Sequence, residues 1–171
     1  MTKMTSAYAN KMLRRLYEEK EFWLNKENEG HLYVAALDEE PVIPEYDYQA
    51  VADQIAAIDD QILKIKHAIN ISNCNNEVQV GEISMTIDTI LVKMAQLNKR
   101  KTVLNQMRRE QSKTRINSGM FSTRKTAPEY RYINYDLDLI KKEYERIDSE
   151  IAAMQIALDK YNQIVEFDVD V

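Results

Sequence analysis

Two pairs of carboxylates at matched spacing are the side chains of this sequence best suited to metal chemistry. Glu18 and Glu21 lie three residues apart, as do Glu145 and Asp148, and residues at this spacing share one face of a helix. Helical enzymes that hydrolyse nucleotides hold magnesium with two such pairs, so a metal-dependent phosphohydrolase is the second alternative for the function. Such pairs are also expected by chance on the solvated helices of a chain with 28 Asp and Glu, and a salt bridge between Asp148 and a basic neighbour is the simpler interpretation.

The remaining candidates for metal or nucleophilic chemistry lack the partners that such chemistry needs. Helical metal sites pair glutamate and histidine three residues apart, but Lys64 precedes His67 at that spacing, and His31 follows a glycine in an expected loop. Cys74 lies in an asparagine-rich turn without a nearby histidine, and no Gly-x-Ser-x-Gly motif or glycine-rich phosphate loop occurs. We therefore expect no catalytic residue, no metal and no cofactor, and a protein that is not an enzyme.

A strongly basic stretch is the most unusual feature of the charge pattern. From Lys93 to Arg131 there are eleven Lys or Arg and two Glu, a net charge of +9 against −14 for the remainder. Such cations neutralise phosphates, and Tyr130 or Tyr132 could stack on exposed bases. A nucleic-acid-associated protein using residues 99–131 is therefore the first alternative. The candidate contacts to nucleic acid or to another partner are Lys99, Arg100, Arg108, Arg109, Lys113, Arg115, Arg124 and Lys125.

The favoured explanation of the basic stretch is charge pairing within the chain or between subunits. No helix-turn-helix or zinc-knuckle pattern accompanies the cations, and acidic segments at residues 38–40 and 59–60 offer partners for them. Lys101 interrupts an apolar stripe. It either extends out to solvent or meets an acidic side chain across a helix interface and fixes the register.

Composition limits the elements that can position these residues. The chain has 171 residues, of which 44% are apolar and 30% charged, and its net charge of −5 suits one soluble globular unit. Only three glycines and three prolines occur, too few for the turns of an all-β or α/β fold. A lone cysteine and the lack of a signal-peptide pattern indicate the cytoplasm. No apolar run approaches the roughly 18 residues of a membrane span.

Apolar residues repeat at alternating spacings of three and four along the chain, which predicts four helices. Their expected ranges are about 5–28, 47–71, 84–113 and 135–164, with Asp47 capping the second and Asn134 or Asp136 the fourth. The stripes are wider than a coiled-coil seam because alanines flank them. We predict a mainly α fold, a four-helix coiled-coil-like bundle with at most a short β element. It would form a single helical domain over residues 1–171 that assembles as a homo-oligomer.

The segments outside the helices carry weaker signals. Alternation over residues 165–171 predicts that the chain leaves the last helix as a short strand. Residues 32–34 and 130–134 are candidate strands that could pair with each other. The polar, basic residues 114–133 predict a loop, and Gly30 predicts a left-handed stop to the first helix.

The second helix carries a family resemblance at its two ends. Pro44-Glu45-Tyr46 leads into it, and it ends in Ile69-Asn70-Ile71-Ser72-Asn73. This ending resembles the Ile-Asn-x-Thr-Asn of a family of small uncharacterised bacterial helical proteins sometimes labelled septicolysin, with Ser72 in place of the usual threonine. The third helix, the segment Glu129-Tyr130-Arg131-Tyr132-Ile133 and the final Asn162-Gln163 also fit, so the resemblance covers nearly the whole chain. It implies a bacterial helical protein of unknown role with no catalytic residues.

The family label suggests a cytolysin, but the sequence argues against a pore. A pore needs apolar spans or repeated alternating strands of about ten residues, and neither occurs here. Asn70 and Asn73 are the motif positions singled out by the resemblance, and helix capping explains both. The expected function is therefore a self-associating interaction or structural protein.

Overall fold

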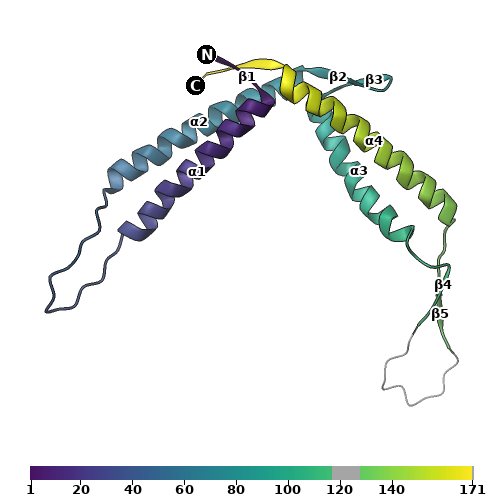
Figure 1. Ribbon diagram of the computed structural model, residues 1–171, viewed down its shortest axis with the longest axis horizontal. Helices are drawn as coiled ribbons and strands as arrows, with labels where there is room; N and C mark the ends of the chain where they lie inside the picture. Colours follow the sequence, from purple (N-terminus) through teal and green to yellow (C-terminus); the bar gives the residue numbers. More distant parts are fainter. Residues whose placement is uncertain (117–127, 171) are drawn as a thin grey trace. The chain divides into compact units, whose positions relative to one another are not determined.

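The computed structural model describes residues 1–116 and 128–170, which fold mainly into α-helices (Figure 1). This part of the chain holds four helices: α1 (Ser6–Gly30), α2 (Tyr48–Asn75), α3 (Ile87–Met107) and α4 (Leu137–Ile164). The same residues hold three antiparallel strand pairs: β1 (Thr2–Thr5) with β6 (Glu166–Val169), β2 (Glu77–Val80) with β3 (Ile83–Thr86), and β4 (Lys113–Arg115) with β5 (Tyr130–Tyr132). The mainly α class is confirmed, and the strand pairs exceed the short β element that we expected.

The chain divides into two compact units, which are described separately. Unit 1 comprises Met1–Asp88 and Ala157–Val171, and unit 2 comprises Thr89–Ile156. Helix α4 contributes residues 137–156 to unit 2 and residues 157–164 to unit 1. A single domain over residues 1–171 stays a prediction, because compactness alone does not show whether the two units unfold together.

Unit 1 is built on the contact between α1 and α2, which lie side by side (Figure 1). Their apolar stripes meet in a buried cluster that also takes in Met4 of β1 and Val169 of β6. In the β1–β6 pair, Thr2 lies opposite Val169 and Thr5 opposite Glu166. The strand predicted after the last helix is therefore confirmed. The helical members of the buried cluster are Ala9, Leu13, Leu16, Ile58, Ile62 and Ile65.

Two of the helix starts carry the caps that the sequence predicts. Asp47 Oδ1 accepts a hydrogen bond from the backbone N–H of Ala50 at 3.2 Å, in front of α2. Asp136 Oδ1 accepts from the N–H groups of Asp138 and Leu139 at 2.8 and 3.1 Å, in front of α4. A short carboxylate just before a helix satisfies N–H groups that have no partner within the helix.

The β2–β3 hairpin changes the boundaries of the third helix. Gly81 has a φ of 61°, a left-handed conformation that glycine adopts without strain, and the tight turn joins the two strands there. Residues 84–86 therefore belong to β3, and α3 begins at Ile87. Helix α3 also ends at Met107, so the expected helix over 84–113 was too long at both ends.

Unit 2 packs α3 against the first part of α4 along one apolar seam. Leu104 of α3 is buried there with Ile140 and Ile147 of α4. Five half-buried side chains complete the seam: Leu97, Met107, Tyr135, Tyr144 and Ile151. A seam of this kind covers one stripe of each helix and leaves the other faces exposed.

The β4–β5 ribbon replaces part of the basic loop expected over 114–133. Lys113 lies opposite Tyr132, and the N–H of Ile116 donates to the carbonyl of Glu129 at 2.9 Å. The expected strand over 32–34 is wrong, since those residues have no secondary structure. Residues 130–132 pair instead with β4, which is nearby in sequence. Closing this short loop costs less conformational entropy than closing the loop of roughly 100 residues that pairing with residues 32–34 would need.

Candidate interaction surfaces

The connection between α1 and α2 exposes a run of large apolar side chains. Val34 is 99% exposed and Val42 89%. The connection, residues 31–47, also holds five Asp or Glu and no Lys or Arg, and we call it the acidic apolar segment. Exposed apolar residues clustered among polar ones are typical of a protein interaction site. The exposed apolar members are Leu32, Tyr33, Val34, Leu37, Val42 and Ile43.

Both ends of the acidic apolar segment are fixed to the end of α1. Gly30 lies so close to Tyr46 that a Cβ at Gly30 would be 2.7 Å from the Cβ of Tyr46. The Tyr46 hydroxyl donates to Glu27 Oε1 at 3.2 Å, and the N–H of His31 donates to the Glu27 carbonyl at 3.0 Å. Partial burial and the neighbouring Glu27 raise the pKa of Tyr46, so its hydroxyl stays a donor. Gly30 does not have a positive φ; the left-handed stop was wrong, and close packing explains this glycine.

Six of the basic candidate residues lie on the second half of α3, in the turn after it and on β4: Lys99, Arg100, Arg108, Arg109, Lys113 and Arg115. Within the residues that the structure describes, none of the six forms a salt bridge. The guanidinium of Arg108 instead lies over the ring of Tyr144, 3.9 Å from its centroid. The other two candidates, Arg124 and Lys125, lie outside the described residues.

Lys101 forms a salt bridge with Asp148 across the α3–α4 interface. The hydrogen bond from its ammonium to Asp148 raises the pKa of Lys101. Of the two alternatives for Lys101, contact with an acidic side chain of a neighbouring helix is therefore the one observed, and Asp148 has the basic neighbour expected for it. The effect of this pair on helix register stays a prediction.

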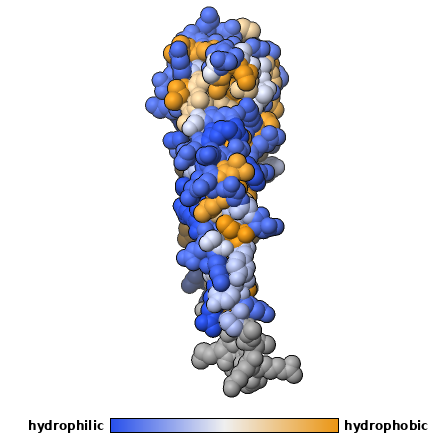
Figure 2. Space-filling view, turned by 90° about the vertical axis from the view of Figure 1, so that its right-hand side faces the viewer, coloured by the Kyte–Doolittle hydropathy of each residue, from blue (hydrophilic) through white to orange (hydrophobic). Residues whose placement is uncertain are grey.

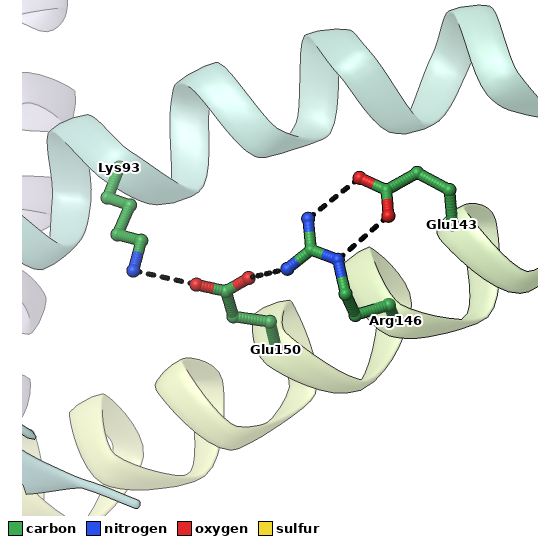
Figure 3. Close-up of polar contacts among 4 residues, drawn as sticks. All are labelled: Lys93, Glu143, Arg146 and Glu150. Atoms are coloured by element: carbon green, nitrogen blue, oxygen red, sulfur yellow. Dashed lines mark hydrogen bonds and ion pairs between the residues drawn. The ribbon is translucent and has the colours of Figure 1, made fainter. Parts of the chain in front are cut away.

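A chain of four charged side chains joins the same two helices (Figure 3). Lys93 Nζ lies 2.6 Å from Glu150 Oε1, and Arg146 Nη1 lies 2.9 Å from Glu150 Oε2. Arg146 also donates to both carboxylate oxygens of Glu143, at 2.8 and 2.9 Å, a strong two-point geometry. Lys93 and then Arg146 lower the pKa of Glu150, and Arg146 lowers that of Glu143. Salt bridges thus account for Lys93 and Lys101 of the basic stretch. Within the described residues the six candidates above form none, although Arg100 also helps to lower the pKa of Glu143.

The side chains considered for metal chemistry are not gathered into a site. Among residues 1–116 and 128–170, no group of three or more His, Cys, Asp or Glu is placed to hold a metal ion. His67 lies on an exposed part of α2, and Cys74 is an exposed free thiol. The phosphohydrolase alternative therefore finds no support in the geometry.

The two motif asparagines do not cap α2, which continues beyond both Asn70 and Asn73. Asn76 is the capping residue, because its Nδ2 donates to the carbonyl of Ser72 at 2.8 Å and to Ser72 Oγ at 3.2 Å. Ser72 Oγ lies 2.6 Å from the hydroxyl of Tyr161 on α4, and both side chains are buried. The expected capping role of Asn70 and Asn73 is therefore wrong, and Ser72 is the motif residue that makes a tertiary contact.

Helix α3 exposes apolar side chains outside its seam with α4. Val92 and Val103 are 59% and 47% exposed, and Lys99 is exposed between them. These three positions share one face of the helix, which we call the outer α3 face. On the side that Figure 2 shows, apolar side chains form separate patches within a largely hydrophilic surface.

Comparisons with known proteins support the fold and say nothing of the function. No family model and no curated relative matches the sequence. Among the described residues, no helix is long and apolar enough to span a bilayer. A crystal structure of a functionally unknown conserved protein from Corynebacterium diphtheriae has a similar fold, with a TM-score of 0.68 and 14% sequence identity over 98% of this chain and 100% of that one. At this identity the likeness shows a shared, mainly helical fold and nothing beyond it.

Proposed function

We propose that this protein is a self-associating interaction protein, in which the acidic apolar segment of one copy docks on the outer α3 face of a second copy. The observation that carries the proposal is the exposure of large apolar side chains on a segment whose two ends are fixed. Fully burying a Val or Leu side chain contributes roughly 1.5–3 kcal/mol. Covering two such side chains in the dimer therefore lowers its dissociation constant by more than about tenfold.

The net charges of the two units favour a contact between unlike units of two copies. Unit 2 holds 14 Lys or Arg and 8 Asp or Glu, so it carries +6; because the whole chain carries −5, unit 1 carries −11. Two copies of the same unit repel each other, whereas unlike units attract and speed the encounter. The acidic apolar segment belongs to unit 1, and the outer α3 face belongs to unit 2. Its Lys99 forms no salt bridge with any residue that the structure describes.

The narrow seam of unit 2 also favours a partner. Among the residues that the structure describes, unit 2 buries five apolar side chains, Ile90, Leu104, Ile140, Ile147 and Met154, against twelve in unit 1. Most helical stability comes from tertiary packing, so covering the outer α3 face stabilises the pair of helices. A two-fold symmetric dimer satisfies both contacts at once, because each copy supplies one segment and one face. In this arrangement, α1 and α2 of one copy lie beside α3 and α4 of the other, and the predicted four-helix bundle forms between copies.

Light scattering at several protein and salt concentrations tests the proposal. We expect a dimer whose dissociation constant rises at least about tenfold between 0.1 and 1 M salt, where the Debye length falls from about 10 to about 3 Å. The paired substitutions Val34→Ser with Leu37→Ser, and Val92→Ser with Val103→Ser, are each expected to give monomers at concentrations where the parent is dimeric. Ile83→Ser on β3 is the matched control, because Ile83 is also exposed but lies outside both surfaces.

Mixing the two double variants provides a second, more specific readout. Each variant retains the surface that the other lacks, so a mixture forms one of the two contacts, and we expect heterodimers where neither variant self-associates. A parent chain that is monomeric at every concentration overturns the proposal, as do double variants that associate like the parent.

The proposal also includes a cytoplasmic location and a relationship to the septicolysin-labelled family. An exposed free thiol at Cys74 supports a reducing compartment. The Ile69-Asn70-Ile71-Ser72-Asn73 motif supports the relationship. Neither the location nor the relationship is needed for the docking of the acidic apolar segment on the outer α3 face.

A further inference from the structure

The β4–β5 ribbon places two tyrosines and two cations on one face. Residues directly opposite each other in an antiparallel pair share a face, and Lys113 lies opposite Tyr132 while Arg115 lies opposite Tyr130. The ammonium of Lys113 lies 4.1 Å from the ring centroid of Tyr130 and 5.5 Å from that of Tyr132, which confirms that the three side chains lie on the same side of the ribbon. We call these four residues the ribbon face.

The ribbon is unusual because no core covers either of its sides. All six residues of β4 and β5 are exposed, and Tyr132 exposes 62% of its surface. A two-stranded ribbon with no packed face is only marginally stable by itself. Large aromatic rings kept in solvent on such an element indicate a ligand that covers them.

The charges around the ribbon face select the kind of ligand. Over residues 108–115 and 129–132 the chain carries five Arg or Lys and two Glu. Within the residues that the structure describes, none of these five cations forms a salt bridge. Neither carboxylate lies within the strands: Glu110 belongs to the turn after α3, and Glu129 comes immediately before β5. The ribbon face therefore offers positive charge that no described carboxylate neutralises, next to two tyrosines that are 39% (Tyr130) and 62% (Tyr132) exposed.

We infer that the ribbon face binds single-stranded nucleic acid. Tyr130 and Tyr132 would stack on unpaired bases, and Lys113 and Arg115 would contact the phosphates on either side. Stacking platforms combined with cations are how sequence-tolerant proteins hold single strands. Bases of a duplex are already stacked and leave no face free for a tyrosine ring. An acidic protein segment would match the cations but would leave the two rings without a specific role. This inference is independent of the self-association proposed above, which uses other residues.

Fluorescence anisotropy of a labelled oligothymidylate of about 20 nucleotides, titrated with the full chain at several salt concentrations, tests the inference. We expect salt-sensitive binding, because each phosphate contact adds roughly 0.7 to the slope of log affinity against log salt for single strands. Tyr130→Ala with Tyr132→Ala should weaken binding at least about tenfold, and the matching Phe substitutions should restore it because they keep the rings. Lys113→Gln with Arg115→Gln should weaken binding and lower the salt slope by about 1.4.

Matched controls separate the ribbon face from charge and aromaticity in general. Tyr8→Ala with Tyr48→Ala removes two other exposed tyrosines, and Lys11→Gln with Arg14→Gln removes two exposed cations of α1. Both control variants should bind like the parent, and circular dichroism should show that every variant keeps its helices.

Three results would overturn the inference. The first is the lack of salt-sensitive binding by the parent chain. The second is equal binding by the Tyr→Ala variant, which would leave charge alone as the cause. The third is displacement of the oligonucleotide by polyglutamate or by duplex DNA at equal concentration, which would identify an acidic protein or a duplex as the better ligand. Light scattering of the ribbon variants should match the parent, which keeps this result separate from self-association.

Discussion

The hydroxyl of Tyr161 lies 2.6 Å from Oγ of Ser72, so a buried hydrogen bond joins the end of α2 to α4 within unit 1. Ser72 Oγ also accepts from Asn76 Nδ2 at 3.2 Å. Tyr161 is only 2% exposed, so its ring packs in the core and its hydroxyl has a buried partner.

Removing the Ser72 hydroxyl should destabilise the fold more than removing the Tyr161 hydroxyl. We expect Ser72→Ala to lower the free energy of unfolding by about 1–3 kcal/mol, because the buried Tyr161 hydroxyl loses its Ser72 partner. Tyr161→Phe should lower it by about 0.5–1.5 kcal/mol, since Asn76 still donates to Ser72 Oγ. Denaturant unfolding of the two single variants and the double variant measures the coupling. Fully additive losses would show that the hydrogen bond does not stabilise the fold.

The charged chain of Figure 3 predicts how stability depends on pH. Because Lys93 and Arg146 lower the pKa of Glu150, the unfolded chain takes up protons at higher pH than the folded one. The stabilisation is therefore complete above the ordinary carboxyl pKa of 4.5 and is lost as the pH falls through the lowered folded value. Glu150→Gln should cost about 0.5–1 kcal/mol at neutral pH.

Urea unfolding from neutral pH down to acid measures this effect. Glu150→Gln should show a shallower loss of stability in the acid range than the parent chain. Glu145→Gln, which removes an exposed carboxylate of α4 outside this charged chain, serves as the control and should keep the parent's slope. A parent-like slope in Glu150→Gln would contradict the expected linkage.

Two glycines should respond to alanine for different reasons. Gly30→Ala introduces a Cβ that would lie 2.7 Å from the Cβ of Tyr46, so the end of α1 and Tyr46 must separate. We expect a loss of about 1–3 kcal/mol in the free energy of unfolding, together with weaker self-association, because Tyr46 fixes the acidic apolar segment. Gly81→Ala has open space around it but a φ of 61°, and should lose about 1 kcal/mol through backbone strain alone. Thermal unfolding measures the stability of the two variants, and light scattering measures their self-association. Unchanged association in Gly30→Ala would show that the contact between Gly30 and Tyr46 is not needed for self-association.

The expected single domain can be tested from either unit. Leu104→Ala in unit 2 should lower the free energy of unfolding by about 2–5 kcal/mol. Because α4 contributes residues to both units, we expect hydrogen exchange to accelerate in α1 and α2 as well as in α3. Ile65→Ala, a buried residue of unit 1, is the reciprocal substitution. Acceleration confined to the substituted unit would show two domains.

The helices were predictable from sequence because their signals are local. Apolar spacing and the caps Asp47 and Asp136 depend on residues within one or two turns. The strand β1 was not predictable, because the strand that it pairs with, β6, follows the last helix and is more than 160 residues away in the sequence. The exact end of α2 was harder to predict, because asparagines compete for backbone hydrogen bonds anywhere near a helix end. The helix ends at Asn75 and is capped by Asn76, a few residues beyond the buried contact of Ser72 with Tyr161.

The candidate surfaces were predicted unevenly. The basic residues of α3 and β4 were found by counting charge. Counting does not separate Lys93 and Lys101, which form salt bridges, from Lys99, which forms none within the described part of the chain. The acidic apolar segment was missed because Leu32, Tyr33 and Val34 resemble a strand. Its signal lay in the acidic residues and in Pro41 and Pro44, which disfavour a paired strand.

The pairing of β1 with β6 has a consequence for biosynthesis. Residues 2–5 are translated before all four helices, and their hydrogen-bonding partners at 166–169 are translated only after them. The buried cluster of unit 1 therefore stays incomplete until residue 169 has been made, because Val169 packs in it together with Met4. At about 5–20 residues per second, Met4 stays without this partner for several seconds of elongation.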